Sequence, residues 1–244
     1  MRRERRFGVD ASSPLSGVNS KLNSVVGVSP RWRGRLLPRI WRHHLPLLLV
    51  SFVSVALLYQ TRPYPDILSR ASFATAYPAL AVLAITLLIG PWNLLRRRSN
   101  PVSSDLRRDI GIWAGLLGIL HAGVGQFVHL RGRPWLYYIY GPTEHHHGPR
   151  HDLFGLANYT GALGTLLLVM LLATSNDLSL RRFGTRRWKQ LQRWNYAAFA
   201  LVAVHSFAFQ GVETQKLHWV LTVAVCVLAA VALQIAGFIK QPAE

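Results

Sequence analysis

The chain has 244 residues, with 28 Lys and Arg against 10 Asp and Glu and a formal net charge of +18. Half of its residues are hydrophobic, and they gather in long runs whereas the charges gather in blocks. Such runs exclude a disordered chain, and they argue against nucleic-acid binding as the reason for the basic charge. The single cysteine, Cys226, excludes an internal disulfide, an all-cysteine iron–sulfur site and a CxxCH haem attachment.

Residues 1–42 contain no apolar run. They hold basic clusters and a stretch rich in Ser, Asn and Gly, and they lack the apolar core of a secretory signal peptide. We interpret them as a basic, mostly disordered cytoplasmic tail, of which residues 35–42 are a candidate for lying on a membrane surface. The membrane domain is expected to occupy residues 43–240.

Six apolar segments follow this tail, and most of them approach the roughly 20 residues that a helix needs to cross a hydrocarbon core. The first is short, and it either begins near His43 and His44 or crosses poorly. None alternates with period two, which argues against a β-barrel. The predicted fold is an all-α integral membrane protein, a six-transmembrane-helix bundle. The segments are residues 45–59, 73–95, 110–130, 153–174, 194–210 and 218–239.

Basic residues are distributed unequally between the two sides of this bundle. With a cytoplasmic amino terminus, the inner segments are residues 1–42, 96–109, 177–193 and the carboxyl end, and they contain 22 of the 28 Lys and Arg. The positive-inside rule therefore predicts that both termini are cytoplasmic, and we expect a multi-pass membrane protein. Anionic lipid headgroups then satisfy the net charge, and no nucleic-acid partner is needed.

Two histidines lie deep inside apolar segments, where polar side chains are costly and need partners. His121 is 13 residues after Arg108, and His205 is 12 residues after Arg193. Because both helices run outward, each imidazole is predicted to lie about 18–20 Å from the inner edge. Two imidazoles at one depth can ligate a haem iron from opposite faces, whereas either histidine alone is explained by one hydrogen bond between helices.

Small residues surround His121 on the third segment. They leave room for a flat macrocycle, or they allow close helix packing, since two of them form a GxxxG pair. The sequence does not decide between these interpretations. The residues are Gly111, Ala114, Gly115, Gly118, Ala122, Gly123 and Gly125.

Two further histidines, His129 and His218, lie near the outer edge. They are candidates for a second haem, with interfacial histidine as the alternative. His129 is eight residues beyond His121, which turns a helix by about 80° from the first ligand. The outer loop of residues 131–152 is also rich in Tyr and His, which indicates either a polar loop with an interfacial aromatic belt or a metal site. These side chains are Tyr137, Tyr138, Tyr140, His145, His146, His147 and His151.

Two sequence motifs resemble the ferric-reductase-like transmembrane family, and most closely the haem-binding membrane subunits of bacterial methionine sulfoxide reductase systems. The resemblance covers roughly residues 45–240. One motif is Arg107, Arg108, Gly111, Trp113 and Ala114 ahead of His121. The other is Thr174, Ser175 and Asn176, then Arg181, Arg182, Gly184, Trp188, Leu191, Arg193 and Tyr196 ahead of His205.

The resemblance implies six helices and b-type haem held by His121 and His205, with a further family histidine matching His218. It also implies a periplasmic molybdenum enzyme as electron acceptor and flavin mononucleotide as a second cofactor. We include His129, Arg108 and Arg193 among the candidate cofactor-binding residues. The chain departs from the larger family members at Pro134, which stands where they carry a second histidine, and this argues against a two-haem wire.

The sequence contains no GxGxxG motif after a strand and no P-loop, so a Rossmann nicotinamide site is excluded. Electrons would come from a separate flavin reductase, bound flavin or quinol. The basic inner loop at residues 181–193 suits a flavin phosphate, although positive-inside topology explains the same residues. The leading hypothesis is an electron-transfer subunit rather than a complete enzyme. The alternatives are a stand-alone ferric-chelate or quinone reductase and a non-redox transporter or assembly factor.

Overall fold

The computed structural model describes residues 37–61, 64–96, 105–130, 132–213 and 216–239. The chain divides into two compact units, Met1–Arg42 and His43–Glu244, and the packing below is that of the second unit. Most of the predicted disordered tail lies outside the described residues. Its last six residues, 37–42, are helical, and the disorder of the rest of the tail stays a prediction.

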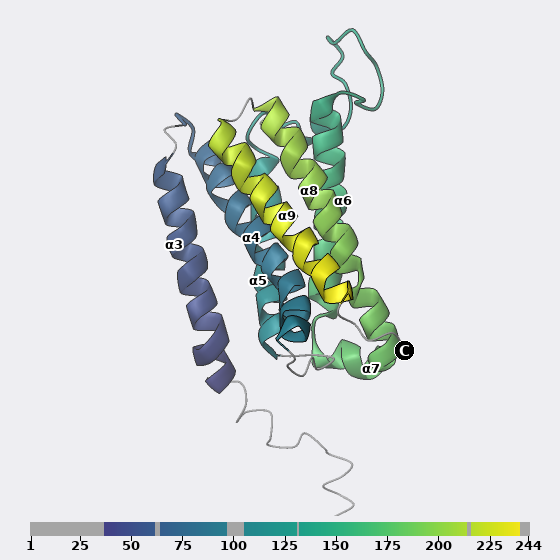
Figure 1. Cartoon of the computed structure of the whole chain (residues 1–244). Coiled ribbons are helices and arrows are strands. Elements are labelled where there is room, and N and C mark those ends of the chain that lie inside the picture. The colour runs from purple at the N-terminus through teal and green to yellow at the C-terminus, as the bar shows by residue number, and fades with distance from the viewer. Residues whose placement is uncertain (1–36, 62–63, 97–104, 131, 214–215, 240–244) are drawn as a thin grey trace, which may run out of the picture. The chain divides into compact units, whose positions relative to one another are not determined.

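The described residues are almost entirely helical (Figure 1). Their one β-feature is an isolated antiparallel bridge between Ile139 and Pro149. The all-α prediction is therefore confirmed for the described part of the chain. In order, the elements are η2 (Ile40–His44), α3 (Leu45–Thr61), α4 (Ile67–Leu95), α5 (Asp105–Gly125), η3 (Pro134–Tyr137), α6 (Leu153–Thr174), α7 (Asp177–Gln192), α8 (Trp194–Val212) and α9 (Leu217–Ile239).

Several helix ends differ from the apolar segments because polar groups decide where a helix begins and ends. α4 begins six residues before the predicted start, because the Asp66 carboxylate accepts a hydrogen bond from Ser69 N at 3.0 Å and caps the helix. α5 ends at Gly125, five residues before the predicted end. His129 therefore lies in the turn after α5, so the expectation that it continues the helix of His121 is wrong.

A side chain from the outer loop ends α5. Tyr137 is buried, and its hydroxyl accepts hydrogen bonds from His129 N at 2.9 Å and Leu130 N at 3.2 Å, while it donates to Gly125 O at 3.2 Å. These backbone groups bond to the loop and not to a further helical turn. The side chain of Tyr137 thus holds the loop after α5 against the bundle.

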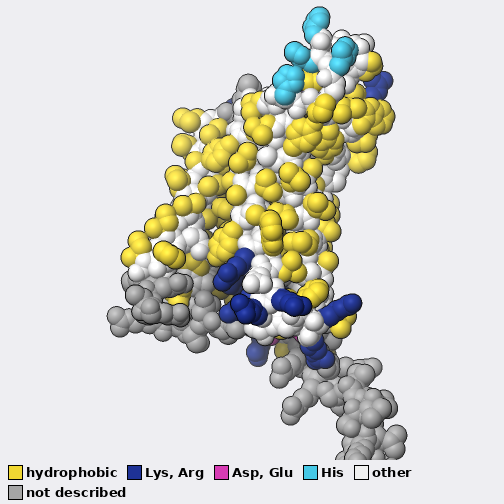
Figure 2. Space-filling view, turned by 90° about the vertical axis from the view of Figure 1, so that its right-hand side faces the viewer, with side chains coloured by type: hydrophobic (Ala, Val, Ile, Leu, Met, Phe, Trp, Pro, Cys, Tyr) yellow, Lys and Arg dark blue, Asp and Glu magenta, His cyan; other side chains and the backbone are white. Residues whose placement is uncertain are grey.

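Four of the described helices are long and apolar enough to cross a membrane: Leu37–Thr61, Ile67–Leu95, Leu153–Thr174 and Leu217–Ile239. Figure 2 shows an apolar band, with Lys and Arg gathered mainly at one end of the view and His at the other. Such a band between polar ends is what a bilayer requires. The chain is a multi-pass membrane protein.

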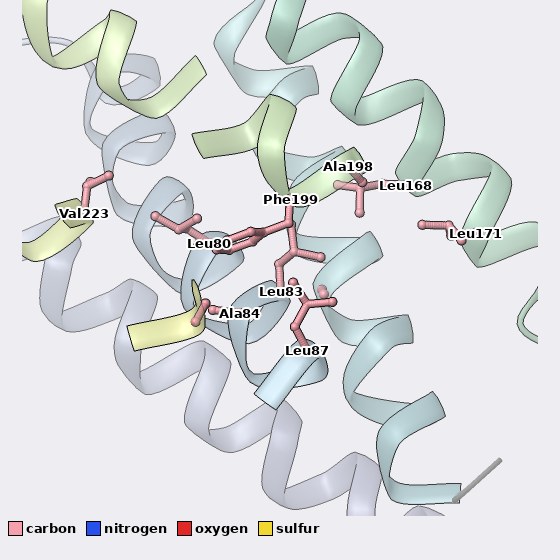
Figure 3. Packing of buried hydrophobic residues seen from close by; sticks show 11 residues of the cluster. Leu80, Leu83, Ala84, Leu87, Leu168, Leu171, Ala198, Phe199 and Val223 are labelled. Carbon is pink, nitrogen blue, oxygen red and sulfur yellow. The ribbon is translucent and has the colours of Figure 1, made fainter. Parts of the chain in front are cut away.

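The helices that carry the two deep histidines pack closely against α4 and α6. The most extensive packing is between α4 and α5 and between α6 and α8, and α9 also packs against α4. Leu80, Leu83 and Leu87 of α4 meet Phe199 of α8 and Leu168 of α6 in the core cluster (Figure 3). The core therefore fixes α5 and α8 relative to each other through their neighbours.

The inner loop between α6 and α8 forms the amphipathic helix α7. It is kinked at Gly184, which has a φ of 70°, a conformation that glycine adopts without a steric penalty. Trp188 is buried and donates from Nε1 to Thr174 O at 3.0 Å, and Arg108 pairs with Asp177. α7 is thereby attached to the inner ends of α5 and α6.

Candidate cofactor site between two membrane histidines

His121 on α5 and His205 on α8 lie side by side inside the helical bundle. Their ring centroids are 6.0 Å apart and their planes are inclined by 73°. The structure thus brings together the two residues that the sequence predicts to lie at the same depth in the membrane. Neither ring is fully exposed, and each is held by a helix other than its own.

A backbone carbonyl holds each imidazole through Nδ1. His121 Nδ1 lies 3.0 Å from Ser72 O on α4, and His205 Nδ1 lies 2.7 Å from Ala157 O on α6. A carbonyl oxygen only accepts hydrogen bonds, so Nδ1 carries the proton in both rings. In the neutral imidazole the lone pair is then on Nε2, which is the arrangement that metal-ligating histidines have.

A cavity of about 700 Å³ adjoins both rings. This volume falls within the range of about 300–1,000 Å³ that is usual for small-molecule and cofactor sites. Its wall is mainly apolar, and it extends outward from His121 and His205 toward His129 and Glu213 at the outer end of the bundle.

The small residues around His121 divide into two groups. Ala114, Gly118, Ala122, Gly123 and Gly125 line the cavity. Gly111 and Gly115 face neighbouring helices, since a Cβ on them would lie 3.9 Å from Thr86 Cγ2 and 3.5 Å from Leu172 Cβ. Gly118 does both, because it lines the cavity and a Cβ on it would lie 2.7 Å from Leu168 Cδ1. Room for a ligand and close helix packing therefore both occur on the same helix.

The separation of the two rings can be compared with that of two imidazoles that share one metal ion. Twice a metal–imidazole bond of about 2.0–2.1 Å, together with the radius of each ring, gives a centroid separation of roughly 6 Å. The observed 6.0 Å meets this condition. The orientation through Nδ1 and the adjoining apolar cavity meet the two other requirements of a bis-histidine haem site.

The outer histidines have different surroundings. His129 Nε2 lies 3.0 Å from Glu213 Oε1, and its ring stacks on Phe209 with centroids 6.1 Å apart. His218 is the second residue of α9, is exposed and contacts Trp219. His129 lines the cavity, whereas His218 is not among the described residues that line it.

The two arginines included as candidates lie at the inner ends of their helices. Arg108 is paired with Asp105 and Asp177, and Arg193 is exposed between α7 and α8. Neither belongs to the described cavity wall. In the structure, Arg108 is held by ion pairs and Arg193 faces solvent, away from the cavity.

Sequence reasoning missed four features of the site: the Ser72 and Ala157 carbonyls, the Glu213 partner of His129, and Gly161 beneath the ring of His205. Backbone carbonyls carry no residue signature, because every residue has one. Gly161 lies in an apolar run where glycine also serves helix packing. Only the packing of α4 and α6 against the histidine-bearing helices reveals these roles.

The fold and this paired-histidine cavity define a multi-pass helical membrane protein with a cofactor-sized site. No protein-family model matches the chain. The protein-methionine-sulfoxide reductase heme-binding subunit MsrQ of Deinococcus radiodurans is 31% identical over 185 residues, which cover 72% of this chain and 76% of that protein. The chain belongs to this MsrQ family of heme-binding subunits.

A second relative is less informative. An uncharacterized protein of Treponema pallidum is 31% identical over 138 residues, which cover 57% of this chain. The match spans 34% of that protein's length, so its remaining two thirds have no counterpart in the alignment.

Proposed function

We propose that the chain is a b-type haem membrane subunit that carries electrons across the membrane. The observation that carries this proposal is the pair His121 and His205, whose rings are 6.0 Å apart and whose Nδ1 atoms are both engaged by backbone carbonyls. The name of the Deinococcus radiodurans relative, a heme-binding subunit, supports the choice of haem as the group bound there.

When bound, the haem supplies one-electron chemistry, and two imidazole ligands leave no open position for oxygen or substrate. The residues of the chain hold and orient the ligands. Ser72 O and Ala157 O keep the Nε2 lone pairs available, and these hydrogen bonds also raise the basicity of the imidazoles. The apolar cavity wall excludes water. We therefore assign this chain electron transfer, as a subunit of an oxidoreductase and not as a complete enzyme.

The membrane topology is part of the proposal. Six crossings by α3, α4, α5, α6, α8 and α9, with both termini in the cytoplasm, place most Lys and Arg inside. Residues 1–42 then form a cytoplasmic tail and residues 43–240 the haem domain, in a bacterial inner membrane. The basic end visible in Figure 2 supports this orientation.

The partners follow from this orientation. Electrons enter from a separate cytoplasmic flavin reductase or from quinol, and they leave to an outer acceptor. The relative's name indicates a protein-methionine-sulfoxide reductase as that acceptor. Flavin mononucleotide near the α7 arginines is part of the proposal, supported by the affinity of arginine for phosphate.

We propose one haem per chain. His129 is engaged by Glu213, and His218 lies outside the cavity wall. A second haem on these two histidines stays a prediction, which a haem-to-protein ratio tests directly.

The decisive experiment is a reduced-minus-oxidised absorption spectrum of purified protein, with haem quantified per chain. We expect the spectrum of a bis-histidine b-type cytochrome. His121→Ala and His205→Ala should each remove most of the haem, whereas His147→Ala, at an exposed loop position, should retain it. Normal haem content in the first two variants would refute the ligand assignment.

The same preparation separates the alternative functions. A colourless protein from cells supplied with haem would indicate a non-redox membrane protein. Oxidation of the pre-reduced protein by a ferric chelate or a quinone, without any partner protein, would indicate a stand-alone reductase. An electron-transfer subunit should instead need its outer acceptor for rapid oxidation.

A further inference from the structure

The outer loop between η3 and α6 forms a small hairpin. Tyr140 N donates to Gly148 O at 2.9 Å, and Arg150 N donates to Tyr138 O at 2.9 Å. Gly148 closes the turn with a φ of 86°, which favours glycine. The chain therefore returns on itself between residues 141 and 148, and it brings His146 and His151 back toward Tyr140.

An ion pair between two residues of this hairpin stabilises its conformation. Arg150 Nη1 and Nη2 donate to the two carboxylate oxygens of Glu144 at 2.9 and 3.0 Å, and Gly141 N donates to the same carboxylate at 2.9 Å. The Arg150 guanidinium also lies 4.8 Å from the ring centre of Tyr140. Bidentate pairs of this kind fix geometry as well as adding energy.

Three rings meet on the hairpin. The centroids of His146 and His151 are 5.0 Å apart at 77°, and each ring lies 5.3 Å from that of Tyr140. Tyr140 is buried and both histidines are exposed. The Tyr140 hydroxyl accepts a hydrogen bond from His151 N at 3.3 Å and lies 3.4 Å from His151 Nδ1. One tyrosine thus positions both imidazoles at the solvent-exposed end of the loop.

We propose that His146 and His151 form a binding site for a late first-row divalent metal ion, distinct from the haem ligands. Two imidazoles on adjacent bonds of one tetrahedral or square-planar ion, at about 2.0–2.1 Å each, have ring centres roughly 5 Å apart. The observed separation of 5.0 Å matches. The contact between Tyr140 and His151 Nδ1 leaves Nε2 of that ring directed to other partners, as in metal sites whose ligands are oriented by a second residue.

The two imidazole nitrogens determine which metal ions bind well at this site. Imidazole suits Zn²⁺, Cu²⁺ and Ni²⁺, and affinity at such a site rises to Cu²⁺ along the first row. The nearby Glu144 carboxylate is occupied by Arg150, so a hard ion such as Ca²⁺ or Mg²⁺ finds few oxygen ligands. Within the described residues, no three His, Cys, Asp or Glu side chains surround a common point. The site therefore supplies two protein ligands and leaves the other positions to water.

The test is a Cu²⁺ titration of the full-length protein, purified through a tag without histidine, with the bound ion examined by electron paramagnetic resonance. We expect one Cu²⁺ per chain with two nitrogen ligands. His146→Ala and His151→Ala should each weaken Cu²⁺ binding at least about tenfold. His145→Ala and His147→Ala are matched controls in the same loop, and they should leave binding nearly unchanged.

Two outcomes would overturn the proposal. Equal weakening by all four variants would show that the ion binds the run of three histidines at 145–147 and not the pair held by Tyr140. Unchanged binding in the double variant His146→Ala/His151→Ala would show that the hairpin holds no site. The haem spectrum of each variant should stay normal, so a failure here is distinguishable from a failure of the haem proposal.

Discussion

Gly161 and His205 lie so close that no side chain fits at position 161. A Cβ there would be 2.5 Å from His205 Nδ1 and 2.8 Å from Cε1. Gly161 is one helical turn after Ala157, whose carbonyl oxygen is 2.7 Å from the same Nδ1. The missing side chain on α6 therefore gives the imidazole access to the carbonyl that orients it.

Gly161→Ala is expected to displace His205 and lower the haem content several-fold. The added methyl group meets the ring of His205, and α6 packs closely against α8, so the imidazole has to leave its hydrogen bond. Haem per chain and the position of the absorption bands measure the effect. Gly111→Ala is the matched control, because a Cβ at Gly111 would meet only Thr86 Cγ2, at 3.9 Å, and Gly111 does not belong to the described cavity wall. A normal spectrum in Gly161→Ala would show that the orientation of His205 through Ala157 O is dispensable.

Tyr137→Phe is expected to destabilise this end of the bundle by about 1–3 kcal/mol, because it leaves partly buried backbone groups at the end of α5 without their partner. The hydroxyl bonds His129 N, Leu130 N and Gly125 O. The thermal unfolding midpoint in detergent measures the change. Tyr196→Phe, which removes one exposed hydrogen bond of 3.4 Å to Gln234, should hardly move the midpoint. Equal midpoints for the two variants would contradict the capping role.

Asp109→Ala is expected to loosen the start of α3 from α5. The Asp109 side chain is fully buried, and its oxygens lie 2.7 Å from His43 Nδ1 and 3.4 Å from His44 Nε2. Trp113 Nε1 donates to His44 Nδ1 at 3.3 Å. Removing the shared acceptor should cost about 1–3 kcal/mol of stability.

Proteolysis and the unfolding midpoint of the Asp109→Ala protein measure this loss. Asp105→Ala is the control, since the Asp105 side chain is 63% exposed and surface ion pairs contribute at most about 1 kcal/mol. Haem content should stay normal in both variants, because neither residue belongs to the described cavity wall. Loss of haem in Asp109→Ala would mean that the contacts of Asp109 with His43 and His44 also support the cofactor site.

The hairpin of the outer loop should loosen in acid. The N–H of Gly141 and the Arg150 guanidinium hold the pKa of the Glu144 carboxyl below its ordinary value. A lowered pKa in the folded state means that the carboxylate stabilises the hairpin above the ordinary carboxyl pKa of about 4.3. That contribution is lost as the pH falls from this value through the folded pKa.

Amide hydrogen exchange at Gly141, corrected for the intrinsic pH dependence of exchange, measures the transition. Protection of this N–H should fall as the pH drops below about 4.3. Glu144→Gln should abolish the pH dependence while it leaves a weaker hairpin. Protection that persists unchanged to lower pH in the unmodified protein would contradict the role of Glu144.

The sequence alone indicated the class of protein and predicted a common depth for its two central histidines. Runs of apolar residues near membrane length, together with basic blocks between them, predict helices and their direction, because a bilayer demands satisfied backbone groups and excludes charge. The residues predicted for α6 match the observed bounds, and the other long helices differ by a few residues at ends that polar groups decide. The spacing from Arg108 to His121 and from Arg193 to His205 follows from the rise of a helix alone.

Only the tertiary structure decided which groups hold these two histidines. It also decided which of the other two candidates, His129 and His218, lies at the same cavity. The orientation of His121 and His205 comes from the Ser72 and Ala157 carbonyls, and the separation of the rings comes from the packing of α4 and α6 between the helices that carry them. Likewise, Glu213, directly after α8, contacts His129 in the turn after α5, while His218 does not belong to the described cavity wall. Sequence patterns report on one helix at a time, whereas these relationships arise between helices that are distant in the chain.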